Sequence, residues 1–278
     1  MSVAGLVTPT LAHIPINQDL KSRLAGIEQR SGGRLGVAVL YTGTGKLVTH
    51  RGDERFPMCS TFKASTTALV LQRVDQGFEQ QDRRIIIHEK DLLQYAPVAK
   101  LHVGGEGLSI TELCVAAMTV SDNTAANLLV ASCGGPSAIT RFWRSIGDVD
   151  SRLDRIEPDL NEGKPGDPRD TTTPTAMLED LHKFVFGNVL KPKSRAQFTK
   201  WLLENKTGAP RLRAGLPRDW KVGDKTGSGH RTTNDIAVLW PPNRKPILVT
   251  AYLTNASESN SHRDAILAEV GHAIASSI

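Results

Sequence analysis

A serine and a lysine three residues apart, in the run Ser60-Thr61-Phe62-Lys63, have the residue types and the spacing for nucleophilic catalysis. In a helix, this spacing places the Ser60 hydroxyl and the Lys63 amine on one face. A serine hydroxyl needs a base to remove its proton, and a lysine becomes that base when burial or neighbouring positive charge lowers its pKa. The head of an apolar helix would add N–H groups that stabilise an oxyanion. Taken alone, the pattern fits a capping serine and a surface lysine better.

A second polar motif, Ser121-Asp122-Asn123, follows a predicted helix and precedes another. Its functional interpretation is that Ser121 relays a proton and that the Asn123 amide holds an amide of a substrate. Its structural interpretation is a helix cap, in which Ser121 or Asp122 accepts hydrogen bonds from the first N–H groups of the next helix.

A third motif, Lys225-Thr226-Gly227-Ser228-Gly229, follows the strand-like run WKVGD. Lys225 offers a cation for a carboxylate, Thr226 and Ser228 offer hydroxyls, and the Ser228 N–H could complete an oxyanion hole. Small residues such as Gly227 on an edge strand let a ligand approach the backbone. The alternative is a charged edge-strand lysine before a glycine turn.

Hydrophobic periodicity and turn signals predict the elements that position these motifs. Strands are predicted over residues 35–41, 46–50, 220–225, 236–240 and 246–254. Helices are predicted over residues 17–31, 60–76, 109–120, 124–132, 136–146, 173–186, 193–204 and 263–276. In the predicted helix 60–76, six of the eleven residues from Ala64 to Val74 are apolar and only Arg73 is charged, which is typical of a helix at the centre of a domain. Residues 152–170 form a long polar loop.

Strands at both ends and helices between them indicate an α+β fold of the α/β sandwich type. We expect a mostly antiparallel five-stranded sheet built from both chain ends and flanked by helices. Residues 1–59 and 206–278 would form this domain, residues 60–205 would form an all-helical domain containing the loop, and the active site would lie between them.

Composition excludes several other classes of protein. The chain has 278 residues, of which 39% are hydrophobic and 23% charged, as in an ordinary globular protein. The net charge is +5, but the basic residues are dispersed and aromatic residues make up only 5%, which argues against nucleic-acid binding. No apolar run is long enough for a membrane span. No cysteine or histidine pattern is typical of a metal site, and neither a metal nor a cofactor is expected.

Together and in this order, the three motifs resemble the set found in class A serine β-lactamases and penicillin-binding proteins. The surrounding runs PMCSTFK, LCVAAMTVSDNTAANLLV, RDTTTPTAM and WKVGDKTGSG agree as well, and the resemblance to class A extends from about residue 17 to the C-terminus. The resemblance implies hydrolysis of penicillins and cephalosporins through an acyl-enzyme on Ser60, which confers antibiotic resistance. It also implies an oxyanion hole formed by the N–H groups of Ser60 and Ser228.

The run Glu157-Pro158-Asp159-Leu160-Asn161 looks like the Glu-x-x-Leu-Asn motif of the same family. The resemblance implies that Glu157 activates the water that hydrolyses the acyl-enzyme and that Asn161 helps to hold this water. It further implies that Arg155 and Asp170 tie the ends of the loop together. Tyr95 matches the aromatic residue at the rim of the site.

The cysteines depart from the family pattern. Many relatives bridge the cysteine matched by Cys114 to a position that is Thr67 here, and some bridge the one matched by Cys59 to a position that is Gly229 here. We therefore expect no intramolecular disulfide, and Cys59 and Cys114 buried.

The source of the arginine that meets the substrate carboxylate is also open. The usual position corresponds to Asn234. Arg211 matches an alternative source used by relatives that lack the first arginine, and Arg263 is a further candidate. Ser228 and the run TTND at 232–235 resemble relatives active on cephalosporins and extended-spectrum substrates.

Several alternatives stay open from the sequence. The base for acylation is Lys63, or Glu157 acting through a water. A D-alanyl-D-alanine carboxypeptidase or penicillin-binding protein, and a non-hydrolysing β-lactam sensor domain, are the rival functions. The relative activity on penicillins, cephalosporins and carbapenems is not determined.

Location and assembly follow only from the resemblance. Residues 1–15, MSVAGLVTPTLAHIP, lack a basic start and a long apolar run, so they do not predict a secretory signal. The chain would then be cytoplasmic or a mature form with an added methionine. The resemblance implies a periplasmic or secreted monomer whose partner is a small β-lactam, with no nucleic acid or membrane.

Overall fold

The computed structural model of the chain describes residues 16–256 and 259–278, so the interpretation of residues 1–15 lies outside the described part. A five-stranded sheet stands at its centre in the order β2-β1-β9-β8-β7, and every neighbouring pair is antiparallel. The strands are β1 (Arg34–Tyr41), β2 (Lys46–His50), β7 (Lys221–Gly229), β8 (Thr232–Trp240) and β9 (Ile247–Thr254). The expected α+β fold, with a sheet drawn from both ends of the chain, is confirmed.

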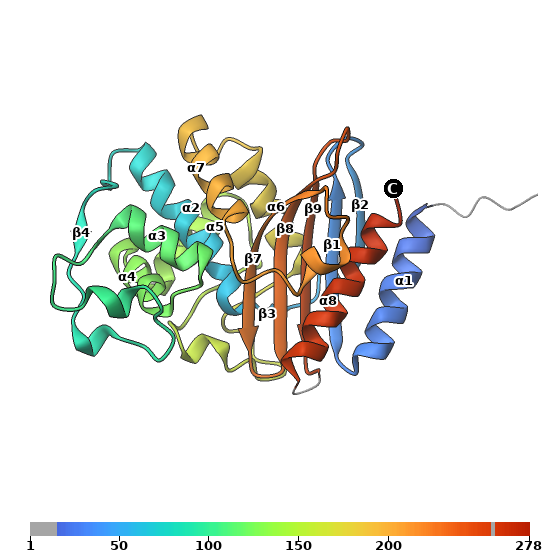
Figure 1. Cartoon of the computed structure of the whole chain (residues 1–278), viewed down its shortest axis with the longest axis horizontal. Helices are drawn as coiled ribbons and strands as arrows, with labels where there is room; N and C mark the ends of the chain where they lie inside the picture. Colours follow the sequence, from blue (N-terminus) through green and yellow to red (C-terminus); the bar gives the residue numbers. More distant parts are fainter. Residues whose placement is uncertain (1–15, 257–258) are drawn as a thin grey trace, which may run out of the picture.

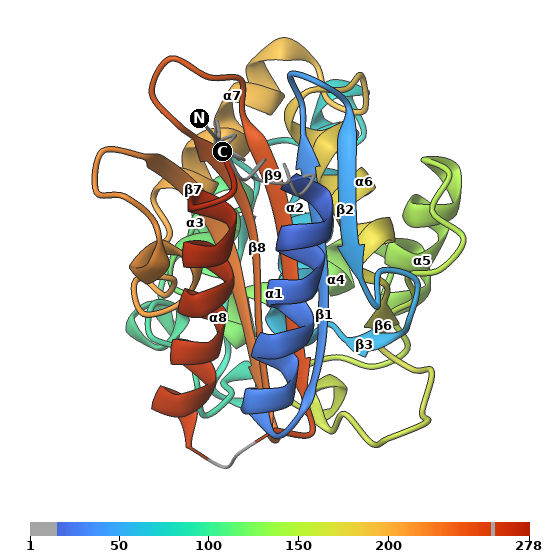
Figure 2. The same cartoon turned by 90° about the vertical axis from the view of Figure 1, so that its right-hand side faces the viewer.

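Two long helices cover one face of the sheet, α1 (Ile16–Ser31) and α8 (Asn260–Ala275) (Figure 2). They lie side by side and bury one apolar face each, with Leu20 and Leu24 from α1 and Ile266 and Val270 from α8. The inward-facing residues of the strands, such as Val37, complete this core. The period of the apolar residues had predicted both helices.

The other helices lie on the opposite side of the sheet and extend beyond its β7 edge (Figure 1). They are α2 (Phe62–Asp75), α3 (Ile110–Thr119), α4 (Asn123–Cys133), α5 (Pro136–Ser145), α6 (Pro174–Val185) and α7 (Pro192–Leu203). Short strands β3 (Phe56–Pro57) and β6 (Thr171–Thr172) pair with each other, as do β4 (Arg84–Ile85) and β5 (Leu108–Ser109). Single-turn 3₁₀ helices are η1 (Cys59–Thr61), η2 (Glu89–Asp91), η3 (Ala99–His102), η4 (Asp159–Asn161) and η5 (Leu212–Gly215).

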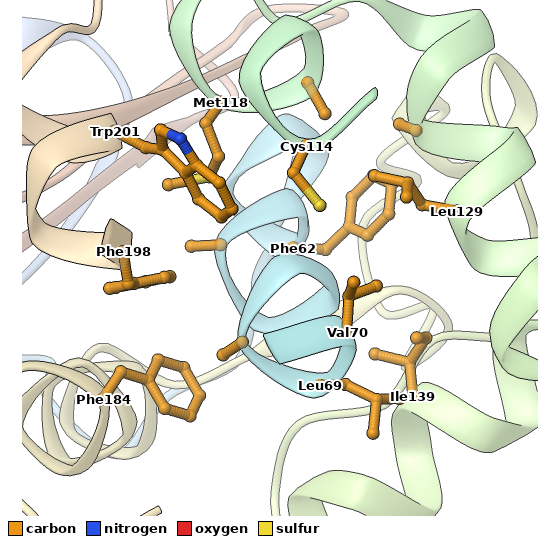
Figure 3. Packing of buried hydrophobic residues seen from close by; sticks show 14 of the residues in the cluster. Phe62, Leu69, Val70, Cys114, Met118, Leu129, Ile139, Phe184, Phe198 and Trp201 are labelled. Carbon is orange, nitrogen blue, oxygen red and sulfur yellow. The ribbon is translucent and has the colours of Figure 1, made fainter. Parts of the chain in front are cut away.

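Helix α2 runs through the middle of these helices, and Figure 3 shows side chains from its neighbours packed around it. Every residue from Phe62 to Leu71 is buried. This stretch includes Ser65, which accepts a hydrogen bond from the indole of Trp143 at 3.0 Å, and Thr66, which donates to the carbonyl of Phe62. These two hydroxyls therefore have hydrogen-bond partners within the protein, which allows their burial.

Two strands are longer than the sequence predicted. Strand β7 was predicted to end at Lys225 but continues to Gly229, and β8 begins at Thr232 rather than at residue 236. The Gly- and Thr-rich residues between these points are typical of a turn. Here their backbone groups pair across the hairpin, with Gly227 opposite Asn234 and Gly229 opposite Thr232. The helix predicted from residue 60 begins with the 3₁₀ turn η1 and becomes α-helical at Phe62.

Candidate active site

A cavity of about 360 Å³ opens along the β7 edge of the sheet, where β7 faces the helices (Figure 1). Its walls combine residues from every motif of the sequence: Ser60, Tyr95, Ser121, Asn123, Asn161, Thr207, Arg211, Thr226 and Ser228. A second cavity of about 400 Å³ lies under residues 163–168 and contains none of these motif residues. The chemistry is therefore concentrated in the cavity beside β7.

Ser60 lies in η1, immediately before α2, and its side chain is nearly buried. The preceding residue, Cys59, has a φ of 45°, a conformation that is uncommon for any residue other than glycine. Ser60 Oγ donates a hydrogen bond to Glu157 Oε1 at 3.1 Å. The serine and a carboxylate from the distant loop are thus in direct contact.

Lys63 is completely buried, and oxygen atoms surround its amine. Its Nζ lies 2.9 Å from the carbonyl of Ser121, 2.6 Å from Asn123 Oδ1 and 3.1 Å from Glu157 Oε1. Burial lowers the pKa of Lys63 below its usual value, and the carboxylate of Glu157 opposes this shift. Because these partners are all acceptors, the ammonium form is the one that satisfies them.

The turn Ser121-Asp122-Asn123 joins α3 to α4, and it combines the two roles that the sequence left open. Asp122 caps α4 by accepting from the N–H of Ala125 at 2.9 Å, which is the structural role. Ser121 has a φ of 60°, and its hydroxyl lies between two lysines, 3.3 Å from Lys63 Nζ and 3.1 Å from Lys225 Nζ. The cap fixes the turn, and the turn directs Ser121 and Asn123 into the cavity.

Lys225 lies on β7 and is fully buried behind the cavity wall. Its ammonium donates to Ser121 Oγ and to the carbonyl of Thr226 at 2.8 Å. Burial and the positive charges of Lys63 and Arg211 lower the pKa of Lys225 well below its usual range. Lys225 is therefore connected to the cavity through its hydrogen bonds to Ser121 and Thr226, because its own amine is not exposed there.

Of the arginine candidates, Arg211 lines the cavity. Its guanidinium donates to Ser228 Oγ at 2.6 Å and to the carbonyl of Gly227 at 2.9 Å, and Asp264 Oδ1 accepts from its Nε at 2.8 Å. Arg263 is not among the cavity residues; it is buried on α8 and donates to Thr233 Oγ1. Asn234, which the resemblance matched to the usual arginine position, is buried, and its amide donates to the carbonyls of Pro57 and Met58.

The loop 152–170 brings Glu157 and Asn161 to the serine. Asn161 Nδ2 donates to Glu157 Oε2, whereas its buried Oδ1 has no protein partner. Asp170 closes the loop by accepting from Arg155 Nε at 2.6 Å and from the backbone N–H of Arg155 at 2.9 Å. Asp170 is buried, so this pair is shielded from solvent.

The remaining predicted residues also lie at this site. Tyr95 is half exposed at the rim, and its hydroxyl donates to the carbonyl of Val120. Gly227 brings β7 so close to the serine that a Cβ on it would lie 3.2 Å from the Ser60 nitrogen. The backbone around Ser228 and that of Ser60 therefore border the same space.

Sequence reasoning missed two residues of this site. Asn127 clamps the backbone of Glu157 from both sides, donating from Nδ2 to its carbonyl at 2.8 Å and accepting from its N–H at 3.0 Å. It lies one helical turn after Asn123, and that spacing was the available signal. Thr207 lines the cavity and bonds to Thr226 Oγ1. No local pattern marks it.

Within residues 16–256 and 259–278, no group of three or more His, Cys, Asp or Glu side chains could hold a metal ion. The same residues contain no helix with the length and apolarity that a membrane crossing requires.

Cys59, Cys114 and Cys133 are free and buried, as expected for the first two. Burial raises the pKa of the Cys133 thiol to about 11.

This arrangement has the parts that acyl transfer requires. A hydroxyl contacts a carboxylate and lies at the head of a buried helix, a second hydroxyl is held between two lysines, and an arginine and a small-residue strand border the cavity. A carboxylate and an amide oxygen stand beside the nucleophile, where a water could be bound.

Comparisons with known proteins agree with this geometry. Residues 19–278 match the model of a family described as the Beta-lactamase enzyme family. The chain is 46% identical to Beta-lactamase CTX-M-25 of Escherichia coli, over 96% of this chain and 94% of that one. It is 49% identical to Beta-lactamase L2 of Stenotrophomonas maltophilia, over 89% and 82%. Among solved structures, an ancestral (GNCA) class A β-lactamase superposes with a TM-score of 0.92 at 60% identity, over 93% of this chain and all of that one.

Proposed function

The chain belongs to the class A serine β-lactamases, and we propose that Ser60 performs the family's hydrolysis of β-lactam antibiotics by forming a covalent acyl-enzyme. The observation that carries the assignment is the direct contact between Ser60 Oγ and Glu157 Oε1, because a nucleophile and a carboxylate base must share one cavity for the ester to form and then to be hydrolysed. β-Lactam hydrolysis confers resistance to these antibiotics.

In the first step the substrate binds along β7. Its carboxylate is attracted by Arg211, by Lys225 and by the hydroxyl of Thr226, and the Asn123 amide holds the acylamide side chain. The lactam carbonyl lies beside Gly227, where its oxygen accepts from the N–H groups of Ser60 and Ser228.

Glu157 is the better-placed base for this acylation. The Ser60 hydroxyl already donates to Glu157, whereas the Lys63 ammonium is occupied by Ser121, Asn123 and Glu157 oxygens. Lys63 contributes its positive charge, which stabilises the carboxylate and the anion that develops on the lactam oxygen. The sequence had left Lys63 and a water-mediated Glu157 open; the direct contact favours Glu157.

Collapse of the tetrahedral intermediate breaks the lactam C–N bond, and the nitrogen needs a proton. The Ser121 hydroxyl supplies it, because this hydroxyl lies within 3.3 Å of Lys63 Nζ and 3.1 Å of Lys225 Nζ, either of which can replace the proton.

Hydrolysis of the ester uses the same carboxylate. The unpartnered Oδ1 of Asn161 and the Glu157 carboxylate together provide two acceptors for a water beside Ser60. Before this step, the proton that Glu157 took from Ser60 passes to Lys63 across their 3.1 Å contact and replaces the one that Lys63 supplied through Ser121. Glu157 then takes one proton from the water as it attacks the ester and gives this proton to Ser60 as Ser60 leaves, so that the ring-opened acid is released and the enzyme is restored.

We also propose a substrate range, a location and a domain division for this enzyme. Ser228 and the run at 232–235 favour activity on penicillins and cephalosporins, with extended-spectrum substrates included. We also propose a periplasmic or secreted monomer, and a division into residues 1–59 with 206–278 and residues 60–205. The lining of the cavity supports a site between these two parts, because Ser60 and Ser121 come from one and Arg211 and Ser228 from the other.

Two variants and a matched control test the assignment. Ser60→Ala should abolish nitrocefin hydrolysis, and Glu157→Ala should accumulate an acyl-enzyme detected by mass spectrometry of the intact protein. Asp159→Ala removes an exposed acid from the same loop and should leave turnover unchanged. Hydrolysis by Ser60→Ala, or full turnover by Glu157→Ala, would contradict the assignment. Stoichiometric labelling of the parent enzyme without turnover would favour a sensor domain, and cleavage of a D-alanyl-D-alanine peptide would favour a carboxypeptidase.

A further inference from the structure

Asn234 lies on β8 and is completely buried, although nothing in the mechanism above uses it. Its side-chain amide crosses to the segment that precedes the nucleophile: Nδ2 donates to the carbonyl of Pro57 at 2.8 Å and to that of Met58 at 3.0 Å. One NH₂ group has two protons, so it can satisfy both carbonyls at once. Asn234 therefore joins the central sheet to the backbone two and three residues before Ser60.

The backbone at this point is strained. Cys59 follows Met58 directly and has a φ of 45°, and such a conformation persists only when its surroundings hold it. The N–H of Met58 donates to the carbonyl of Asp170, and its carbonyl also accepts from Thr61 at 3.2 Å. These bonds and the two from Asn234 fix the direction in which the chain enters Ser60, and hence the direction of the Ser60 N–H.

The same residue also contacts the opposite wall of the cavity. The backbone carbonyl of Asn234 accepts from Arg211 Nη1 at 2.7 Å, and Arg211 Nη2 donates to Ser228 Oγ. Asn234 is thus bonded by its side chain to the nucleophile turn and by its backbone to the cation of the substrate site.

Close packing leaves little room for another arrangement. Gly227 pairs with Asn234 across the β7–β8 hairpin. A Cβ on Gly227 would lie 2.8 Å from the Met58 carbonyl and 3.3 Å from Asn234 Nδ2. The missing side chain of Gly227 is therefore what lets the amide reach the turn.

We propose that Asn234 is a positioning residue for the oxyanion hole: its amide holds the Pro57–Met58 backbone so that the Ser60 N–H points at the lactam oxygen. The inference rests on the proposed function in one respect, the role of Ser60 as nucleophile. Without the amide, the Pro57 and Met58 carbonyls lose their bonds to the sheet, and only Thr61 still donates to Met58. The strained turn then relaxes, so the N–H donor is displaced while the hydroxyl and its base remain.

The test compares three variants. Asn234→Ala removes both hydrogen bonds, and Asn234→Ser keeps a smaller donor in case the alanine variant does not fold. Thr250→Val is the matched control, because Thr250 is equally buried on β9 and also donates to a carbonyl, that of Pro174 at 2.7 Å, away from the nucleophile. All three should lose stability, so stability alone does not discriminate.

Two readouts report on the oxyanion hole. The first is the acylation rate by rapid mixing with nitrocefin, which should fall about 10- to 100-fold in Asn234→Ala, less in Asn234→Ser, and remain near the parent value in Thr250→Val. The second is the infrared stretch of the ester carbonyl in the acyl-enzyme, measured in a Glu157→Ala background. A weaker hydrogen bond to the ester oxygen raises this frequency, so Asn234→Ala should shift it upward and Thr250→Val should not.

Three results would overturn the proposal in different ways. If the Asn234 variants have the same acylation rate and carbonyl frequency as Thr250→Val, Asn234 has only a structural role. A slow rate with an unshifted carbonyl would place its effect elsewhere than the oxyanion hole. Hydrolysis of nitrocefin by Ser60→Ala would instead reject the proposed function, and with it the basis of this inference.

Discussion

Glu157 Oε1 lies 3.1 Å from the hydroxyl of Ser60, although 97 residues separate the two in the chain. The same oxygen is 3.1 Å from Lys63 Nζ. A single carboxylate oxygen is therefore bonded to the nucleophile and to the neighbouring cation. In the proposed mechanism, this contact makes Glu157 the acceptor of the serine proton as well as the base for deacylation.

If Glu157 takes the serine proton, its loss should slow the formation of the acyl-enzyme and not only its breakdown. We expect the acylation rate of Glu157→Ala to fall about 10²- to 10³-fold, because general-base catalysis contributes on this order. Rapid mixing with nitrocefin measures the burst. A burst as fast as that of the parent enzyme would assign the proton to Lys63.

Lys225 predicts an alkaline limit to activity. Burial and the charges of Lys63 and Arg211 lower the pKa of Lys225, so it loses its proton at a lower pH than an ordinary lysine. The cation that attracts the substrate carboxylate is then lost as pH rises. The alkaline decrease in kcat/KM should therefore begin at a pH lower than ~10.4, the usual lysine pKa. In Lys225→Arg the guanidinium does not titrate in this range, so the fall should move to higher pH. An identical alkaline limb in both proteins would show that another group titrates.

Asp170 should control the loop that carries Glu157. Its carboxylate accepts from the N–H groups of Asp154 and Arg155 and from the Arg155 side chain. Asp170→Asn should lower the free energy of unfolding by about 1–3 kcal/mol and slow deacylation about tenfold, since the loop positions the catalytic carboxylate.

The control for this prediction is the exposed partner of the same arginine. Glu162 pairs with Arg155 at 2.7 Å on the surface, where solvent screens the pair, and Glu162→Gln should leave the free energy of unfolding nearly unchanged. Chemical denaturation and single-turnover kinetics provide the two measurements. Equal effects of the two substitutions would mean that the loop does not depend on Asp170.

A buried pair of acids predicts pH-dependent stability. Burial and the adjacent Asp148 carboxylate raise the pKa of Asp180 well above its usual range, and Lys183 lies 3.7 Å from it. The native state keeps a proton that the unfolded chain loses near pH ~4, so native stability falls as pH rises toward the raised pKa.

Asp180→Asn replaces the protonated acid by an amide that does not titrate. Its advantage in unfolding free energy over the parent should be larger at pH 8 than at pH 5, by more than about 1 kcal/mol. Urea denaturation at both values measures this difference. Glu179→Gln, at the exposed neighbouring position on α6, should show no such trend. A constant difference between the Asp180→Asn variant and the parent at the two pH values would contradict the raised pKa of Asp180.

The sequence predicted the helices and the five strands because apolar periodicity reports which face of each element is buried. It also predicted the local motif of Ser60 and Lys63, since three residues in a helix form one face. Glu157 could be identified only through the family resemblance, because nothing local distinguishes it from other acids of its loop. Its contact with Ser60 depends on how the loop packs, which no spacing encodes.

Two residues whose roles the sequence did not predict act across long separations. Asn127 clamps Glu157, and Asn234 bonds to Pro57 from another strand. Each is an ordinary polar residue in its own segment and gains a role only when two distant segments meet. The end of β7 escaped prediction for a related reason: its glycines are strand residues only because β8 pairs with them.

The position of β1 in the sheet has a consequence for biosynthesis. Strand β1 lies between β2 and β9, and Arg34 pairs with Thr254. The ribosome therefore makes β2 directly after β1, but it makes β9 only near the end of the chain. While the ribosome makes the intervening helices, the β1–β2 hairpin has an open edge whose backbone groups can pair with another nascent chain. A product truncated before residue 247 retains that edge permanently, and we expect it to aggregate rather than to persist as a partly active fragment.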